Sequence, residues 1–297
     1  MAKTVGWLAM SHAPQVMIDP DRWHMINQPK PTEPLAPELL DLSIETKRER
    51  WARCTSAIDA LRERLDELAP DTVIVVGDDQ HENVNDENCP PFLIYLGEEA
   101  EASSSLKYIG ETPEQNRATY RVDTELANWL VEDLMESGFD PGYSRRTTHF
   151  MGLGHAFARV LKRLTPDARY PIIPVMVNTY YPPAPSARRC AQFGRALANS
   201  IGRFAPDRRV VVVGSGGLSH TRIDLDLDHA FIRALETNDQ GFMERMPSEE
   251  LVDGTSEIRC WVITATAADR PVASVTYEPM PRVPTGAGVG MGFASWT

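Results

Sequence analysis

Four consecutive valines at residues 210–213 lead directly into the stretch GSGGLSH at residues 214–220. An unbroken run of β-branched residues predicts a strand covered on both faces, as in a parallel sheet between layers of helices. The glycines allow backbone conformations that side chains forbid, and they let a ligand approach the chain closely. His220 then follows the carboxyl end of this strand, where open α/β sheets place their ligand crevices.

The glycine segment alone leaves two interpretations open. It is either a turn that ends in a surface histidine or part of a functional site, because imidazole both binds metals and titrates near neutral pH. Other strand ends are needed to decide between them.

Strand-like and helix-like stretches alternate along the 297 residues. Strands are predicted at residues 5–10, 72–76, 92–96, 170–177, 210–213 and 272–277, and helices at residues 39–68, 124–137, 156–164, 187–204, 226–237 and 257–268. This alternation predicts one α/β domain over residues 1–297, with a central mostly parallel or mixed sheet and helices on both faces. The proline-rich segment 19–37 is predicted to be a long loop. The glycine-rich tail from Pro279 contains Met291, Phe293 and Trp296, so we expect it to pack against the domain.

Composition narrows the class of protein. A formal net charge of -12 without a basic run argues against a nucleic-acid partner. No apolar segment approaches the roughly 20 residues needed to span a bilayer, so no membrane partner is expected. The four cysteines are scattered without close pairing, and a reduced, cytoplasmic setting is the expectation.

Three predicted strands end in side chains that bind metals or move protons. His12 follows the strand at 5–10, the run DDQHE at residues 78–82 follows the strand at 72–76, and His220 follows the valine strand at 210–213. Each alone is more simply a strand-end cap, but parallel strands bring their carboxyl ends to one edge of the sheet, and together they favour a site. Glu257 begins a predicted helix, where it either complements the helix dipole or acts as a ligand. Two histidines and one carboxylate would suit non-haem Fe(II) with open positions.

These segments resemble the class III extradiol ring-cleavage dioxygenases, typified by the catalytic subunit of protocatechuate 4,5-dioxygenase. The similarity is carried by SHAP at residues 11–14, GSGGLSH at 214–220 and SEIRCWV at 256–262. The loop at 19–23 and the tail at 286–296 look closest to the 3-O-methylgallate dioxygenase branch. The resemblance implies Fe(II), a small aromatic diol, O2 and a homo-oligomer.

The resemblance also implies roles for single residues. His12 matches the first iron ligand, Glu257 matches the carboxylate ligand, and His220 matches the histidine that transfers protons beside the substrate. His155, in the segment GHAF, is a second acid/base candidate, with His149 as its competitor.

The chain departs from the family pattern at the second iron-binding histidine. An ungapped comparison places Gln80 there, whereas His81 is one residue further on. Imidazole is the better Fe(II) ligand, but a shift of one residue reverses side-chain direction in an extended segment. Both residues stay candidates.

The predicted reaction is extradiol (meta) cleavage of a catechol, with both atoms of O2 inserted into the ring. The alternatives are cleavage of an aminophenol, a non-catalytic binding or signalling relative of the same fold, and a zinc hydrolase. Four arginines are candidates for binding a substrate carboxylate: Arg22, Arg145, Arg146 and Arg222.

Overall fold

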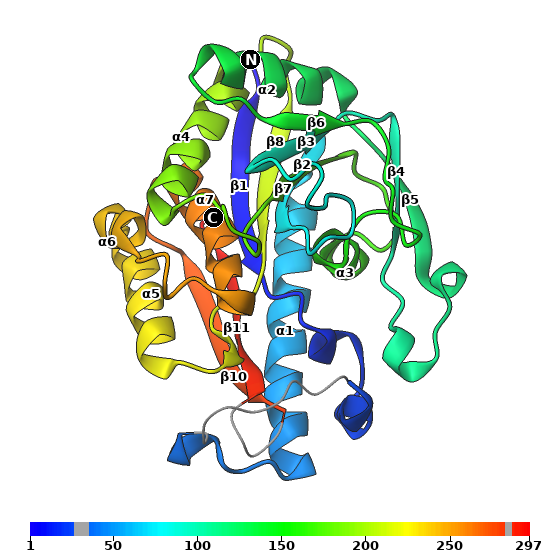
Figure 1. Ribbon diagram of the computed structural model, residues 1–297, viewed down its shortest axis with the longest axis vertical. Coiled ribbons are helices and arrows are strands. Elements are labelled where there is room, and N and C mark those ends of the chain that lie inside the picture. Colours follow the sequence, from blue (N-terminus) through cyan, green and yellow to red (C-terminus); the bar gives the residue numbers. More distant parts are fainter. Residues whose placement is uncertain (27–35, 283–286) are drawn as a thin grey trace.

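The protein is built around one large mixed sheet, seen in a computed structural model that describes residues 1–26, 36–282 and 287–297 (Figure 1). Its strands are β1 (Lys3–Met10), β2 (Thr72–Asp78), β3 (Phe92–Tyr95), β6 (Gly142–Ser144), β7 (Ile172–Val177), β8 (Arg209–Ser215), β10 (Ser274–Pro281) and β11 (Ala287–Ser295). Their order across the sheet is β10-β11-β1-β8-β2-β7-β3-β6, and β9 (His220–Arg222) pairs with β11. A small separate sheet joins β4 (Glu99–Ser103) to β5 (Arg117–Arg121).

The centre of the large sheet is parallel, and the strand next to the centre on each side runs antiparallel to it. β1, β8, β2 and β7 run in the same direction. β11 lies antiparallel to β1, and β3 lies antiparallel to β7. The mixed α/β sheet predicted from the sequence is therefore confirmed, and the carboxyl ends of the four central strands meet at one edge.

Helices cover both faces of the sheet, and alternate residues of the valine strand are buried on each face. The helices are α1 (Ile44–Leu68), α2 (Thr124–Glu136), α3 (His155–Leu164), α4 (Ala187–Arg203), α5 (Leu225–Thr237), α6 (Gln240–Arg245) and α7 (Ile258–Ala268). Because side chains alternate along a strand, Val210 and Val212 enter one core while Val211 and Val213 enter the other. The first core includes residues of α2, α4 and α7, and the second includes residues of α1 and α3.

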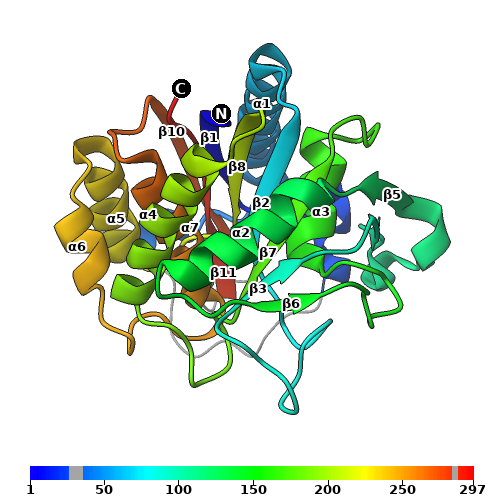
Figure 2. The same ribbon diagram turned by 90° about the horizontal axis from the view of Figure 1, so that it is seen from above.

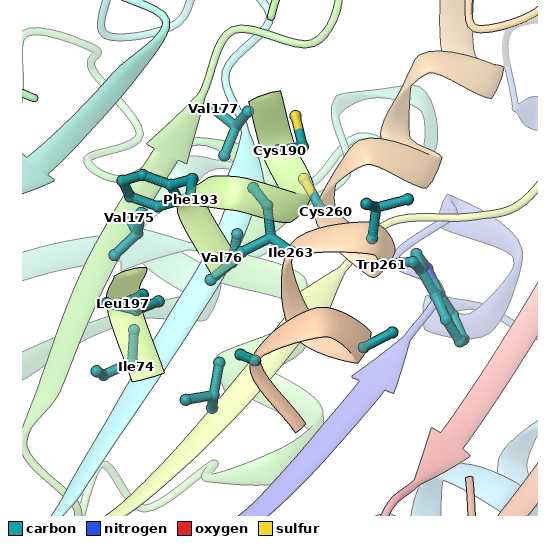
Figure 3. Packing of buried hydrophobic residues seen from close by; sticks show 14 of the residues in the cluster. Ile74, Val76, Val175, Val177, Cys190, Phe193, Leu197, Cys260, Trp261 and Ile263 are labelled. Carbon is teal, nitrogen blue, oxygen red and sulfur yellow. The ribbon is translucent and has the colours of Figure 1, made fainter. Parts of the chain in front are cut away.

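The first of these cores is shown at close range in Figure 3. Phe193 of α4 and Ile263 of α7 pack over Val76 and Val175 of the sheet. All four side chains are fully buried, which explains why these stretches are apolar in the sequence. Viewed from above, α5 and α6 lie at one side of the molecule and β5 at the opposite side (Figure 2).

Several predicted boundaries were wrong. The helix expected from residue 39 begins at Ile44, because the Ser43 side chain caps it by accepting the Thr46 N–H at 3.3 Å. Residues 20–25 of the predicted long loop form a 3-10 helix, and residues 27–35 lie outside the described residues. The tail packs as expected, but as strand β11, and residues 283–286 of it are not described. Within the described ranges, no helix is long and apolar enough to cross a membrane.

Candidate metal centre and active site

A cavity of about 660 Å³ opens at the carboxyl edge of the parallel strands. It is lined by residues that come from segments far apart in the sequence, including His12, Gln80, His81, His149, His155, Tyr180, His220 and Glu257. The expectation that separate strand ends converge is therefore confirmed for this edge of the sheet. The lining residues differ, however, in the hydrogen-bond partners that orient their side chains.

His12 follows β1 and is 2 % exposed. Its Nδ1 lies 2.9 Å from Ser215 Oγ, and the Ser215 hydroxyl donates to the Ala156 carbonyl at 2.6 Å. Because that hydroxyl proton is already committed, His12 Nδ1 must carry a proton and donate it to Ser215 Oγ. The lone pair is thereby left on Nε2, which lies 3.5 Å from Glu257 Oε1. This is the tautomer that a metal-binding histidine needs.

Glu257 is the last residue of a 3-10 turn (Asp253–Glu257) and directly precedes α7. Its Oε2 accepts the Gly217 N–H at 2.7 Å, so the glycine segment positions this carboxylate. Burial raises the pKa of Glu257, but His12, His220 and the Gly217 N–H outweigh burial and hold the pKa well below its usual range. The carboxylate is therefore ionised and faces His12 Nε2 through its other oxygen.

His220 starts β9 rather than ending the valine strand, because β8 ends at Ser215. Its Nδ1 lies 3.0 Å from the Leu218 carbonyl, which only accepts, so Nδ1 carries the proton of the neutral ring. The basic Nε2 then lies 3.4 Å from Glu257 Oε2. Burial lowers the pKa of His220 despite the nearby Glu257 carboxylate, which keeps the imidazole neutral and basic near pH 7.

His155 begins α3 and pairs with Glu82, a residue that sequence analysis left without a role. His155 Nδ1 lies 3.0 Å from Glu82 Oε2, and its backbone N–H donates to both oxygens of that carboxylate at 3.1 Å. Burial raises the pKa of Glu82, but the charge and hydrogen bonds of His155 lower it to about 2. Burial lowers the pKa of His155, but Glu82 outweighs it and the net shift is upward. His155 thus differs from His220 in the direction of its shift.

His149, the competitor of His155, lines the same cavity but makes different contacts. Its ring tilts against Phe150 at a centroid distance of 4.5 Å, and its Nδ1 is buried without a hydrogen-bond partner among the described residues. The ring of His155, in contrast, meets the ring of His12 edge-on at 4.9 Å. His155 is therefore the one of the two that lies against the first ligand candidate.

Asp78, the last residue of β2, completes the cluster. Its Oδ1 is buried, lies 3.9 Å from His12 Nε2, and accepts no hydrogen bond from any described residue. The ligand atoms of His12, Asp78 and His155 all lie within 4.8 Å of one another. Burial and the charge of Glu257 raise the pKa of Asp78 to about 6, although His12 lowers it. An orphaned carboxylate oxygen beside an imidazole lone pair fits a divalent cation, which would satisfy both.

Gln80 and His81, the two candidates for the second ligand, are held differently. The Gln80 amide donates to Asp78 Oδ2 at 3.0 Å. His81 adopts a left-handed backbone conformation with φ of 57° and stacks on Tyr181 at a centroid distance of 3.5 Å. Its Nε2 lies 3.4 Å from the exposed carboxylate of Asp86. The Gln80 amide is therefore held against the outer oxygen of Asp78, and the His81 ring is held against Tyr181 and Asp86.

Two arginines that sequence analysis missed line the cavity, namely Arg159 and Arg282. Arg159 is 8 % exposed and donates to the His12 carbonyl at 3.1 Å, and burial lowers the pKa of both arginines. The four arginines suggested by the sequence are not among the residues that line it. No pattern in the sequence separates Arg159 from the other basic residues of its helix, Lys162 and Arg163.

The fold and the site define a class of protein: a mixed α/β domain with a histidine–carboxylate cluster at the carboxyl edge of its parallel strands. Comparison with known proteins then identifies the family. The family described as the catalytic LigB subunit of aromatic ring-opening dioxygenase matches residues 36–286, and the chain belongs to this family.

Individual relatives match a shorter part. The chain is 33% identical over 166 residues to "2,3-dihydroxyphenylpropionate/2,3-dihydroxicinnamic acid 1,2-dioxygenase 2" of Pseudomonas putida, covering 55% of this chain and 48% of the relative. It is 35% identical over 165 residues to the corresponding dioxygenase of Cupriavidus necator, covering 54% and 47%. The chain therefore spans about half the length of the curated relatives it matches. A solved structure of an Escherichia coli K12 protein aligns with a TM-score of 0.49 at 13% identity, over 97% of this chain and 98% of that one, which is too weak a likeness to support a statement.

Proposed function

We propose that the protein is an Fe(II)-dependent extradiol dioxygenase that cleaves a catecholic ring and inserts both atoms of O2. Membership of an aromatic ring-opening dioxygenase family supports this reaction class. The observation that carries the proposal is the convergence of His12, Glu257, His155 and His220 on one cavity. These four residues come from separate segments of the chain, and each has the chemistry of a ligand or a proton carrier.

His12 Nε2 and Glu257 Oε1 are the proposed ligands on which the metal site is built. They lie 3.5 Å apart, and the tautomer of His12 leaves its lone pair on the correct nitrogen. Fe(II) bound there would hold the two hydroxyls of a catechol beside O2 and would acidify those hydroxyls. Nitrogen and carboxylate ligands with open positions are the donor set that non-haem Fe(II) oxygenases use.

His220 and His155 are proposed to divide the proton transfers between them. The pKa of His220 is lowered by burial, so its Nε2 accepts a proton from a substrate hydroxyl. The pKa of His155 is raised by Glu82 despite burial, so it holds a proton that it can return to the product. Environments that push two pKa values apart are the usual sign of an acid and base pair.

The substrate is proposed to be a catechol that carries an acidic side chain. Arg159 and Arg282 place two guanidinium groups on the wall of the cavity, and a carboxylate is the group that such cations recognise. The matched relatives are named for 2,3-dihydroxyphenylpropionate, which is a diol of this type.

The enzyme is further proposed to be a cytoplasmic homo-oligomer. Four free cysteines support a reducing compartment, and light scattering on the purified protein tests the assembly.

The test is anaerobic reconstitution with Fe(II), followed by addition of a panel of catechols and 2-aminophenol in air. The proposal predicts a yellow ring-opened product from a catechol and stoichiometric iron. His12→Ala is expected to lose both, whereas His24→Ala, which changes an exposed histidine that contacts the Asp21 carbonyl, is expected to keep both. Activity in His12→Ala would overturn the assignment. Turnover of 2-aminophenol alone would identify the aminophenol enzyme, and absence of bound iron would favour a non-catalytic relative.

A further inference from the structure

Asp78 is the residue through which β2 reaches the metal site. We infer that Asp78 Oδ1 is a metal ligand, and that neither Gln80 nor His81 occupies that position. This inference rests on the proposed function, because it concerns the same metal ion that His12 and Glu257 would bind. It gives the site a carboxylate where the family resemblance implies a second histidine.

The contrast with the adjacent Asp79 supports a ligand role. Asp79 is a structural cap, because its two oxygens accept the backbone N–H groups of Glu82, Asn83 and Val84 at 3.0 to 3.1 Å. Asp78 is equally buried, yet its Oδ1 has no such donor. A buried carboxylate oxygen without a partner is costly. A bound cation removes that cost.

The distances allow one ion to reach both side chains. Asp78 Oδ1 lies 3.9 Å from His12 Nε2, and His12 Nε2 lies 3.5 Å from Glu257 Oε1. Both separations are below about 4.2 Å, which is twice the ~2.1 Å bond that divalent ions make to nitrogen and oxygen ligands. His12 Nε2 and Asp78 Oδ1 are therefore close enough for one ion to contact both.

Gln80 then acts as a positioning residue. Its amide donates to Asp78 Oδ2 at 3.0 Å, which fixes the carboxylate and turns Oδ1 toward His12. An amide of this kind orients a ligand without bonding to the metal. His81 is occupied elsewhere, since it stacks on Tyr181 and faces Asp86.

The experiment measures binding of Co(II) to the metal-free protein by calorimetry and by the Co(II) absorption spectrum, under conditions that involve no turnover. Asp78→Asn keeps the shape of the side chain and removes the charge. Asp86→Asn is the matched control, because Asp86 lies in the same loop and its side chain is 93% exposed. We expect Asp78→Asn to weaken Co(II) binding by on the order of 100-fold, and Asp86→Asn and His81→Ala to stay within about twofold of the wild type.

Thermal unfolding separates a ligand role from a structural one. Without metal, Asp78→Asn is expected to be at least as stable as the wild type, because it removes a buried orphaned charge. With Co(II), the wild type gains stability and Asp78→Asn gains much less. Gln80→Ala is expected to weaken binding by about tenfold while the Co(II) spectrum keeps its shape, since the ligand set is unchanged.

Each remaining outcome is decisive. Loss of Co(II) binding in His81→Ala, or a changed spectrum in Gln80→Ala, would overturn the inference even if Asp78→Asn failed to fold. Wild-type binding in Asp78→Asn would also overturn it. If His12→Ala binds Co(II) as tightly as the wild type, the proposed metal centre itself is wrong, which is a separate failure.

Discussion

His12 Nδ1 donates to Ser215 Oγ at 2.9 Å, which ties the end of β1 to the end of β8 across 203 positions of sequence. The two strands are parallel neighbours, with Met10 in register with Ser215. Because the Ser215 hydroxyl donates its hydrogen bond to the Ala156 carbonyl, it can only accept from His12 Nδ1. This chain of hydrogen bonds leaves the lone pair of the His12 ring on Nε2. The sheet register thus determines the tautomer of the proposed metal ligand.

Ser215→Ala should weaken metal binding without unfolding the protein. The substitution removes the acceptor of the His12 Nδ1 proton, and loss of such an orienting partner costs on the order of 10- to 100-fold in metal affinity. Co(II) titration by calorimetry measures the change. Ser144→Ala is the control, because the Ser144 hydroxyl donates to the Arg146 carbonyl at 2.7 Å and accepts the Arg146 N–H at 3.3 Å, and Ser144 is not among the residues that line the cavity. Unchanged affinity in Ser215→Ala would show that His12 is oriented by other contacts.

His220 should set the acid limb of the pH profile of kcat/KM. A base must be neutral to act, and the lowered pKa of His220 keeps it neutral to a pH below its ordinary value of 6.5. The limb is therefore expected below pH 6.5. His220→Gln should reduce kcat by about 10²- to 10⁴-fold, abolish this limb and leave metal content unchanged. The same limb in His220→Gln would assign the base to another group.

The sequence predicted the large features because their signals are local. The valine strand and the parallel core follow from apolar runs, and His12 follows from the polar residues after one of them. His220 and Glu257 were singled out by the motifs that carry the family resemblance, and both line the cavity. Strand β11 was missed because glycine disfavours strands intrinsically, and its pairing with β1 and β10 overrides that preference.

The partners within the site were less accessible to sequence reasoning. Glu82 and Asp78 lie in the run DDQHE, but which members of that run face His12 depends on backbone geometry. The left-handed backbone conformation of His81 turns the chain at this point. The residue types in this run do not predict that turn. Arg159 reaches the cavity only because α3 packs beside β2 and β8.

Glu82→Gln should destabilise the protein in a defined pH window. The pKa of Glu82 is lowered from 4.5 to about 2, so its stabilising contribution is complete above pH 4.5 and is lost as the pH falls toward 2. The pKa of His155 is raised, so its contribution is complete below pH 6.5 and is lost as the pH rises through the folded pKa. The loss in unfolding free energy should therefore be largest between pH 4.5 and 6.5, at about 1–3 kcal/mol.

Urea unfolding of both proteins across this range measures the effect. Glu67→Gln is the control, since the Arg64–Glu67 pair lies at the surface and such pairs contribute at most ~1 kcal/mol. A destabilisation of Glu82→Gln that is constant from pH 4 to 9 would contradict the ion pair.

Gly217→Ala should impair catalysis more than metal binding, because Gly217 lies where the His220 ring needs space. A Cβ at position 217 would stand 2.1 Å from His220 Cε1 and 2.9 Å from Nε2, so the imidazole has to move. A displacement of about 1 Å at a catalytic group costs on the order of 10²-fold in rate. Gly202→Ala is the matched control, because its added Cβ would meet no described heavy atom within 4 Å apart from its chain neighbours and the nearby backbone of its own helix. Alanine in α4 should raise stability by ~0.5–1 kcal/mol without affecting kcat. Steady-state kinetics on Fe(II)-loaded protein compare the two, and equal kcat values would show that the His220 ring position does not limit the reaction.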